Sequence, residues 1–422
     1  MPVIVQKFGG TSVADAARIR RAAQRIADAR RAGFDVVVVA SAMGPTTDEL
    51  ISLAEEVSPV PDRRELDMML ATGEQVSVGL LALALREVGC AASSLTGGQA
   101  GIRTDGVHGR ARITRIECGR LERMISRGET PVVAGFQGTS DDGEITTLGR
   151  GGSDTTAVAI AAALRVADAG GYCEIYTDVD GVYTADPRLV RGAVKLPRIS
   201  YEEMLELATL GAGVMHARAV LFGEKYGVPI HVRHSQRPDH GTMISRENPG
   251  MEELAVVGCA LKEDLGRVSI RQIKNALGLQ GRLFTALASS NIVVDDIMQT
   301  EHGSSTMIAF TVDHADLSDA KQIVAKTLLD LNEGEMSIDV GLAKVSVVGV
   351  GMKIHAGVAS RMFRALGEVG VAIHNITTSE IKISCIIDAA SGQRALETVH
   401  SAFGLGLGIN ATVAMQTDSP RL

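Results

Sequence analysis

The sequence of 422 residues contains no tryptophan, and only 3% of its residues are aromatic. Its five cysteines lie far apart without a C-x-x-C pair, so neither a disulfide framework nor a zinc site is indicated. The net charge of −8 argues against nucleic acid as a partner, because phosphate neutralisation needs a basic face. No basic N-terminal segment leads into an apolar stretch, and no uncharged apolar run reaches membrane-spanning length. We therefore expect a cytoplasmic protein with no membrane partner.

Small aliphatic residues take the place of the missing aromatics, since 45% of the chain is hydrophobic and 46 residues are glycine. This composition favours α/β layers, and the length favours two or three domains. In the first part of the chain, apolar strand-like runs alternate with helix-like segments, at 3–5, 15–31, 36–40, 131–136, 156–165, 173–176 and 228–232. We predict an α/β fold with a mostly parallel sheet sandwiched by helices, which binds ligands beyond the carboxyl ends of its strands.

The pattern changes at residues 246–250, a polar stretch with Pro and Gly that is typical of a linker. Two similar segments follow, each with the order of strands and helices of a ferredoxin-like βαββαβ unit. We predict a first domain at 1–245, a linker and entry to the following region at 246–263, and two ferredoxin-like domains at 264–336 and 337–422. Tandem copies indicate either a paired regulatory module or a duplicated dimerisation element.

A lysine and two glycines follow the first apolar strand, in Lys7-Phe8-Gly9-Gly10. Glycines let backbone N–H groups approach an anion, a following helix adds its positive end, and the lysine adds a full charge. The order is not that of a Walker A loop. The motif predicts a phosphate site, but a plain turn with a solvated lysine is an equally good interpretation of the motif alone.

Three further segments carry polar groups to the expected carboxyl edge. Gly149-Arg150-Gly151-Gly152-Ser153-Asp154 opens a helix with an arginine suited to a carboxylate or phosphate, although Ser153 or Asp154 could simply cap that helix. The stretch 176–188 could form a nucleotide lip or an ordinary surface loop. Ser41 follows an all-valine strand, and Glu74 could be no more than a first-turn acid favoured by the helix dipole.

Taken together and in order, these motifs resemble those of the monofunctional aspartokinases of the amino-acid kinase family. The resemblance spans the whole chain and implies the amino-acid kinase fold followed by two ACT domains. It rests on six segments: Lys7-Phe8-Gly9-Gly10-Thr11-Ser12, Ser41-Ala42-Met43-Gly44, Thr72-Gly73-Glu74, Gly135-Phe136-Gln137-Gly138, Gly149-Arg150-Gly151-Gly152-Ser153-Asp154 and 176–188.

The resemblance implies that ATP phosphorylates the side-chain carboxylate of L-aspartate, in the first step of lysine, threonine and methionine biosynthesis. Lys7 would neutralise charge on the transferring phosphoryl group, and Asp154 would organise the catalytic cations. The implied ATP-binding residues are Lys7, Phe8, Gly9, Gly10, Ser41, Thr177, Asp178, Tyr183, Thr184, Ala185, Asp186, Pro187 and Arg188. The implied substrate-binding residues are Thr47, Glu74, Arg150, Gly151, Gly152 and Ser153. Mg²⁺ would bind mainly through the ATP phosphates, without a dedicated set of protein ligands.

The ACT domains imply feedback regulation by lysine, threonine or both, and a homodimer or higher oligomer formed through these domains. The implied effector residues are Asn275, Gly278, Gln299, Ser379 and Glu380. Some relatives also produce a shorter regulatory subunit from an internal start, for which Met251 is the candidate here.

Two departures from the family pattern stand out. Gly213 occupies a position where many relatives carry a nucleotide-contacting lysine, so Arg188 or Lys225 is our hypothesis for a replacement cation. In the first ACT copy, Asn275 stands near the place of an aspartate, which predicts weak or altered inhibition through that copy. A catalytically silent amino-acid sensor is the alternative function, and so is a kinase for another carboxylate.

Overall fold

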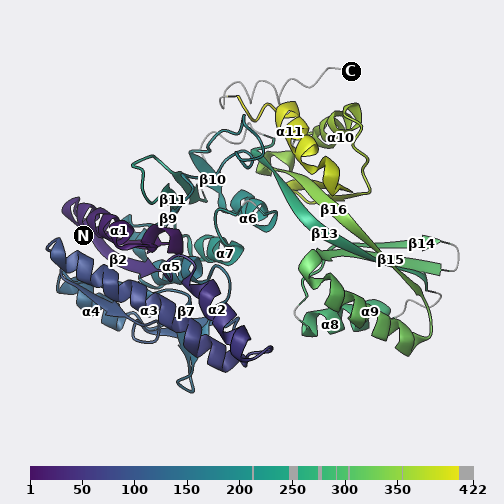
Figure 1. Ribbon diagram of the computed structural model, residues 1–422. Helices are drawn as coiled ribbons and strands as arrows, with labels where there is room; N and C mark the ends of the chain where they lie inside the picture. The colour runs from purple at the N-terminus through teal and green to yellow at the C-terminus, as the bar shows by residue number, and fades with distance from the viewer. Residues whose placement is uncertain are drawn as a thin grey trace. The chain divides into compact units, whose positions relative to one another are not determined.

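The computed structural model describes residues 1–211, 213–246, 255–273, 278–290, 292–302, 305–353 and 355–407 (Figure 1). Contacts divide the chain into two compact units, neither of which is one continuous segment. The first consists of Met1–Tyr183, Lys195–Thr209 and Gly213–Gly250, and the second of Thr184–Val194, Leu210–Ala212 and Met251–Leu422.

An eight-stranded sheet forms the centre of the first unit, with the strand order β10-β12-β11-β9-β1-β2-β6-β3. Adjacent strands pair in parallel, except for the antiparallel pair β11–β12. The strands are β1 (Val3–Phe8), β2 (Asp35–Ala40), β3 (Ala92–Leu95), β6 (Thr130–Ala134), β9 (Cys173–Thr177), β10 (Arg198–Ser200), β11 (Ile230–His234) and β12 (Thr242–Ser245). The mostly parallel sheet agrees with the α/β prediction.

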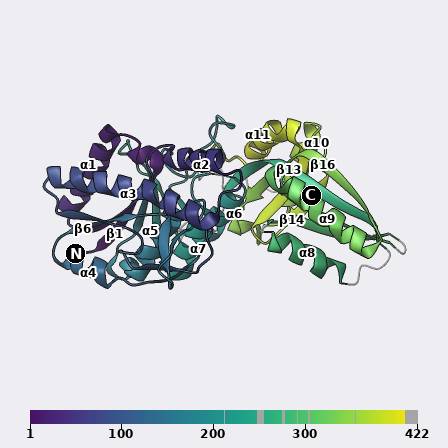
Figure 2. The same cartoon turned by 60° about the horizontal axis from the view of Figure 1, so that its bottom comes forward.

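Helices cover both faces of this sheet (Figure 2). They are α1 (Ala16–Arg31), α2 (Thr46–Val57), α3 (Arg63–Glu87), α4 (Gly119–Ser126), α5 (Gly152–Ala163), α6 (Tyr201–Thr209) and α7 (Ala217–Tyr226). Ile4 and Phe8 of β1 share a hydrophobic core with α1 and α3. Because side chains alternate along a strand, Lys7 points to the opposite face, where α5 lies. The alternation of side chains along β1 thus places Lys7, the predicted catalytic lysine, on the face of the sheet that α5 covers.

A smaller sheet, β5-β4-β7-β8, extends the first unit. Its strands are β4 (Ile102–Thr104), β5 (Ile113–Ile116), β7 (Gln137–Ser140) and β8 (Ile145–Thr147). A hydrogen bond between the buried hydroxyls of Thr104 and Thr146 joins two of these strands (2.6 Å). Strand β8 matters for the site because it ends just before Arg150.

Helix α3 is long and apolar enough to cross a membrane by length and composition alone, with a mean hydropathy of 1.5 in its most apolar window. Half of that window is buried inside the protein, where Val78, Leu81 and Leu85 join the core of the first unit. In this structure α3 is therefore a core helix.

One six-stranded antiparallel sheet runs through the second unit, in the order β14-β15-β13-β16-β18-β17. Its elements are β13 (Gly258–Ile273), α8 (Leu279–Ser289), β14 (Asp295–His302), β15 (Ser305–Asp313), α9 (Leu317–Leu331), β16 (Glu335–Val348), α10 (Val358–Glu368), β17 (Asn375–Thr378), β18 (Lys382–Asp388) and α11 (Gly392–Ala402). The described chain also has short 3₁₀ helices. The first unit contains η1 (Gly10–Val13) and η2 (Val166–Ala169), and the second contains η3 (His314–Asp316), η4 (Val350–Lys353) and η5 (Ala389–Ser391).

The long strands β13 and β16 belong to both halves of this sheet. Cys259 in the first half of β13 packs in one hydrophobic core with α10 and α11, whereas Val268 and Ile270 in its second half pack with α8 and α9. Residues 258–263, which we predicted to belong to the linker and the entry to the regulatory region, lie in strand β13. The segment 184–194, predicted to belong wholly to the first domain, joins the second unit through Ala185 and Val190. Of the predicted linker, residues 247–254 lie outside the described part of the chain.

Candidate active site

The carboxyl ends of four neighbouring parallel strands bring the predicted motifs to one edge of the sheet. Strands β9, β1, β2 and β6 are adjacent, and Phe8 lies in register with both Tyr176 and Ala40. The residues that follow these strands are Asp178, Gly9, Ser41 and Gly135. The prediction that ligands bind at this edge therefore has the geometry that it requires.

Lys7 and Asp154 form an ion pair at this edge. Lys7 Nζ lies 2.7 Å from Asp154 Oδ1, and the two side chains are only 11% and 13% exposed. Asp154 lies in the first turn of α5, where the helix dipole favours a negative charge. Gly9 leaves room for the lysine, because a Cβ at position 9 would lie 3.3 Å from Nζ. The lysine is thus held at the mouth of the glycine turn.

The Gly9–Gly10 turn packs directly against the loop that follows β2. A Cβ on Gly10 would lie 2.9 Å from the carbonyl oxygen of Ala42, and Gly44 N–H donates to the Gly10 carbonyl (3.1 Å). Ser41 N–H donates to the carbonyl of Phe8 (3.0 Å). Glycine is therefore needed at position 10 for close approach, and Ser41 lies next to the phosphate-site motif, as predicted.

Glu74 is a buried acid on α3, only 3% exposed. Its Oε1 accepts a hydrogen bond from Ala42 N–H (3.0 Å), whereas Oε2 is buried and meets no hydrogen-bond partner among the described residues. Burial raises the pKa of Glu74 to about 7, although the Ala42 hydrogen bond opposes the shift. Gly73 allows this approach, since its Cβ would lie 2.9 Å from that of Ala42. Glu74 is therefore more than a first-turn acid, because α3 begins at Arg63.

The N-terminus of α5 reaches the same edge through two close contacts. A Cβ on Gly135, just after β6, would lie 2.8 Å from Ser153 Oγ. Gly151 has φ +70°, and its Cβ would lie 2.2 Å from Cγ of His216, the N-cap residue of α7. Ser153 and Gly152 are buried in the first turn of α5. The backbone N–H groups of this turn supply an anion-binding helix start.

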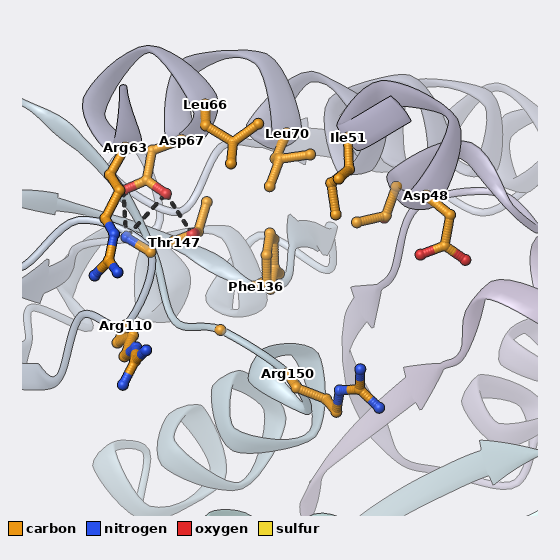
Figure 3. Close-up of a pocket in the computed structure, with 13 residues that line it drawn as sticks. Asp48, Ile51, Arg63, Leu66, Asp67, Leu70, Arg110, Phe136, Thr147 and Arg150 are labelled. Atoms are coloured by element: carbon orange, nitrogen blue, oxygen red, sulfur yellow. Dashed lines mark hydrogen bonds between the residues drawn. The ribbon is translucent and has the colours of Figure 1, made fainter. Parts of the chain in front are cut away.

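A pocket of ≈ 590 Å³ opens beside this helix start (Figure 3). The predicted substrate residues Thr47 and Arg150 both line it, together with Phe136. Phe136 has φ +66°, which is unusual for a residue with a side chain, and its N–H donates to Thr156 Oγ1 (3.2 Å). The structure therefore brings Thr47 and Arg150 to one cavity, and Phe136 is an addition to the predicted site residues. It stood in a quoted motif, but nothing in the sequence marked its conformation.

The predicted nucleotide stretch begins just after β9. Thr177 Oγ1 donates to Asp178 Oδ1 (3.0 Å), and both residues are at least partly exposed. Asp180 accepts a hydrogen bond from Tyr183 Oη (2.9 Å) and lies 3.4 Å from Lys195 Nζ. Partial burial by itself would raise the pKa of Asp180, but Tyr183 and Lys195 outweigh it and hold that pKa below its ordinary value. Tyr183 is thus fixed by an anionic partner.

The rest of this stretch belongs to the second unit. Ala185 packs in the core with α10 and α11, Thr184 shares a hydrogen bond with His400 of α11 (3.0 Å), and Arg188 pairs with Asp186. The stretch 176–188, which the sequence offered as a nucleotide lip, is therefore divided between two units after Tyr183. Pro187 lies between the two members of the Asp186–Arg188 pair.

Of the two proposed replacement cations, Lys225 lies in the last turn of α7. The first turn of that helix abuts Gly151, and the length of α7 places Lys225 about 13 Å further along. The hypothesis that Lys225 replaces the missing lysine is therefore not favoured. His216 at the start of α7 was not among the predicted site residues. Burial lowers its pKa, and nearby Asp154 opposes the shift.

The predicted effector residues lie in the second unit, apart from Asn275, which is outside the described residues. Gly278, with φ +77°, is the N-cap of α8, and Gln299 in β14 accepts a hydrogen bond from Gln280 of α8 (2.8 Å). Ser379 and Glu380 lie in the turn between β17 and β18, where Ser379 N–H donates to the carbonyl of Lys382. Whether they bind an effector stays a prediction.

Two parts of the chain match known protein families. Residues 2–234 match the amino acid kinase family, and residues 345–403 match the ACT domain. The aspartokinase of Geobacillus stearothermophilus is 49% identical over 406 residues, which cover 96% of this chain and 98% of that relative. Aspartokinase 2 of Bacillus subtilis is 48% identical over 405 residues with the same coverage. The chain belongs to the aspartokinases of the amino acid kinase family.

Solved structures of the family share this fold. E. coli aspartokinase III in complex with aspartate and ADP has a TM-score of 0.80 and 26% identity, covering 95% of this chain and 100% of that one. The same enzyme in complex with lysine and aspartate has a TM-score of 0.74 and 25% identity. The predicted fold class and family are confirmed.

Proposed function

We propose that the chain transfers the γ-phosphoryl group of ATP to the side-chain carboxylate of L-aspartate, giving ADP and 4-phospho-L-aspartate. The observation that carries this assignment is that a buried acid, Glu74, lies at the same sheet edge as cationic groups. Glu74 Oε2 is buried without a partner among the described residues, which suits an α-ammonium group, and Arg150 suits a carboxylate. An amino acid with a second carboxylate fits this pattern of charge.

The acceptor needs no general base, because a carboxylate with an ordinary pKa of about 4 is already anionic at neutral pH. The protein therefore has to position the two substrates in line and neutralise charge on the transferring group. Lys7 carries that positive charge, and Asp154 fixes its ammonium group at 2.7 Å. The first turn of α5 adds backbone N–H groups at the same edge.

Mg²⁺ fits this site as a companion of ATP. No group of three or more His, Cys, Asp or Glu side chains in the described ranges could hold a metal ion. Mg²⁺ commonly binds through one or two carboxylates and the phosphates of its nucleotide, and Asp154 is a carboxylate at the phosphate edge. When bound, the ion would neutralise phosphate charge.

The test is an assay with ATP, aspartate and hydroxylamine, in which acyl phosphate is trapped as the aspartyl hydroxamate. We expect product with aspartate and none with glutamate. Product with glutamate alone would assign the chain to another carboxylate. No product with either, together with binding of amino acids, would favour the silent sensor, for which the glycine at position 213 is the supporting feature.

We further propose feedback regulation by lysine, threonine or both through the second unit, within lysine, threonine and methionine biosynthesis. The ACT match and the lysine complex of E. coli aspartokinase III support this proposal. Each amino acid titrated separately should change activity or melting temperature, and no response to either would contradict it. Sedimentation and intact-mass measurements on natively expressed protein would test the proposed oligomer and the shorter chain from Met251. Fractionation would test the cytoplasmic location.

A further inference from the structure

A carboxylate outside the predicted site ties together three walls of the pocket that Arg150 lines. Asp67, on α3, is 1% exposed. It accepts hydrogen bonds from the hydroxyl of Thr147 (2.5 Å) and from Gly109 N–H (3.0 and 3.1 Å) (Figure 3). It also pairs with Nδ1 of His108 (2.8 Å). Both of its carboxylate oxygens therefore have hydrogen-bond partners within the protein.

Each of the three segments that meet at Asp67 carries an arginine into the same pocket. Arg63 begins the helix that holds Asp67, Arg110 follows Gly109, and Arg150 follows Thr147 by three residues. A displacement of Asp67 or of its partners would therefore move the cationic groups relative to one another. The pocket has the charge of an anion site, and Asp67 is the group that connects its parts.

The segment between Thr147 and Arg150 is held from a second side by α7. Arg218 donates one hydrogen bond to the carbonyl of Leu148 (2.6 Å) and another to the carbonyl of Ala111 (3.1 Å). Ala111 N–H in turn donates to the carbonyl of Thr147 (2.8 Å). Gly149, with φ +76°, packs closely on the carbonyl of Gly109, since its Cβ would lie 3.1 Å from that oxygen.

We infer that Asp67 is a positioning residue for acceptor binding, which acts through Thr147 on Arg150 and is assisted by Arg218. It touches neither substrate in this assignment. It fixes the backbone from which Arg150 extends and the loop that carries Arg110. The inference rests on the proposed function, because it takes Arg150 as the residue that binds the acceptor carboxylate.

The test compares substitutions that differ by one hydroxyl. Thr147→Val removes the donor to Asp67 at nearly constant volume, whereas Thr147→Ser keeps it. Thr104→Val is the matched control, because it removes a buried hydroxyl from the same small sheet without touching Asp67. We expect Thr147→Val to raise the aspartate KM about tenfold or more and to leave the ATP KM within about twofold. Thr147→Ser and Thr104→Val should stay within about twofold of wild type for both substrates.

Asp67→Asn tests the same inference independently and can decide it even if Thr147→Val fails to fold. Asp67→Asn should raise the aspartate KM and leave the ATP KM unchanged. In an Arg150→Gln background, neither Asp67→Asn nor Thr147→Val should add more than about twofold, because the arginine through which they act is gone. Full additivity there, or equal effects on both substrates, would overturn the inference while the enzyme remains an aspartokinase. A wild-type chain that fails to phosphorylate aspartate would instead overturn the proposed function.

Discussion

Lys7 and Asp154 meet in an ion pair of 2.7 Å although they lie far apart in the sequence. Lys7 lies near the carboxyl end of a central strand, and Asp154 lies in the first turn of the helix that covers that strand. Both side chains are largely buried, so the pair is shielded from water and its geometry is restricted by packing. A cation fixed in this way needs little reorganisation when charge develops on a phosphoryl group.

Lys7→Met should therefore lower kcat by about 10²- to 10³-fold and change the aspartate KM much less, because the charge is needed mainly in the transition state. Steady-state kinetics of hydroxamate formation would measure both constants. Lys225→Met is the control, since that lysine lies over the ring of Tyr226 in the last turn of α7. Turnover of Lys7→Met near the wild-type value would contradict the role that we give to this lysine.

Glu74 predicts how substrate binding depends on pH. Burial raises its pKa to about 7, so the free enzyme carries the neutral acid at lower pH and the carboxylate at higher pH. Because only the carboxylate can pair with an ammonium group, kcat/KM for aspartate should fall about tenfold per unit as pH drops below 7. Glu74→Gln should have low kcat/KM throughout and lose this slope. A slope that survives in Glu74→Gln would assign the titration to another group.

Glu74 also predicts how the stability of the fold depends on pH. Substrate binding should weaken as the pH falls, whereas the fold should lose stability as the pH rises. A carboxyl whose pKa rises from 4.5 in the unfolded chain to about 7 in the folded protein stabilises the fold at low pH, and that contribution is lost as pH rises towards 7. Glu74→Gln should then be more stable than wild type at pH 8, by up to about 3 kcal/mol. Thermal denaturation at pH 5 and pH 8 would measure the difference, which should shrink at pH 5.

Gly151 should tolerate no side chain. Its positive φ and a Cβ position 2.2 Å from His216 combine strain with a collision. Gly143→Ala is a matched control, because φ is +86° there and no atom lies within 4 Å of the Cβ position. We expect the control to cost about 1 kcal/mol of unfolding free energy and to remain active. Gly151→Ala should cost clearly more and lower kcat/KM for aspartate, because Arg150 precedes it directly. Equal behaviour of the two variants would show that His216 moves aside freely.

Lys344 is a buried lysine of β16 that neutralises two aspartates of β14. Its Nζ lies 2.5 Å from Asp295 Oδ2 and 2.6 Å from Asp296 Oδ2, and the side chain is 1% exposed. Lys344→Met leaves Asp296 buried without its cation and should destabilise the second unit by about 3–5 kcal/mol. Calorimetry of thermal unfolding would measure this loss of stability, and Lys321→Met, at an exposed lysine, is the control. A change below about 1 kcal/mol would mean that Asp296 becomes neutral or solvated at little cost.

Much of the fold could be predicted from local patterns. Short apolar runs separated by helix-like segments indicate a parallel sheet, and the repeated order of strands and helices indicates two ferredoxin-like units. The domain boundaries were harder to predict from the sequence, because they are set by the pairing of strands that lie far apart in the chain. Strand β13 serves both halves of one sheet, and residues 184–194 leave the first unit for the core of the second. Neither fact follows from composition or periodicity.

By itself the sequence determined which motifs carry charge and glycine, and hence the family and the chemistry. It left open whether Glu74 was an ordinary helix acid and whether Lys7 was a solvated residue in a turn. Tertiary structure decided both, because desolvation raises the pKa of Glu74 and α5 supplies an anionic partner for Lys7. The contacts of Asp67 could be recognised only in the tertiary structure, since its partners His108, Gly109 and Thr147 lie in two segments far from it in the chain. The role of a buried carboxylate depends on the groups that packing brings into contact with it, and these are not evident from its position in the sequence.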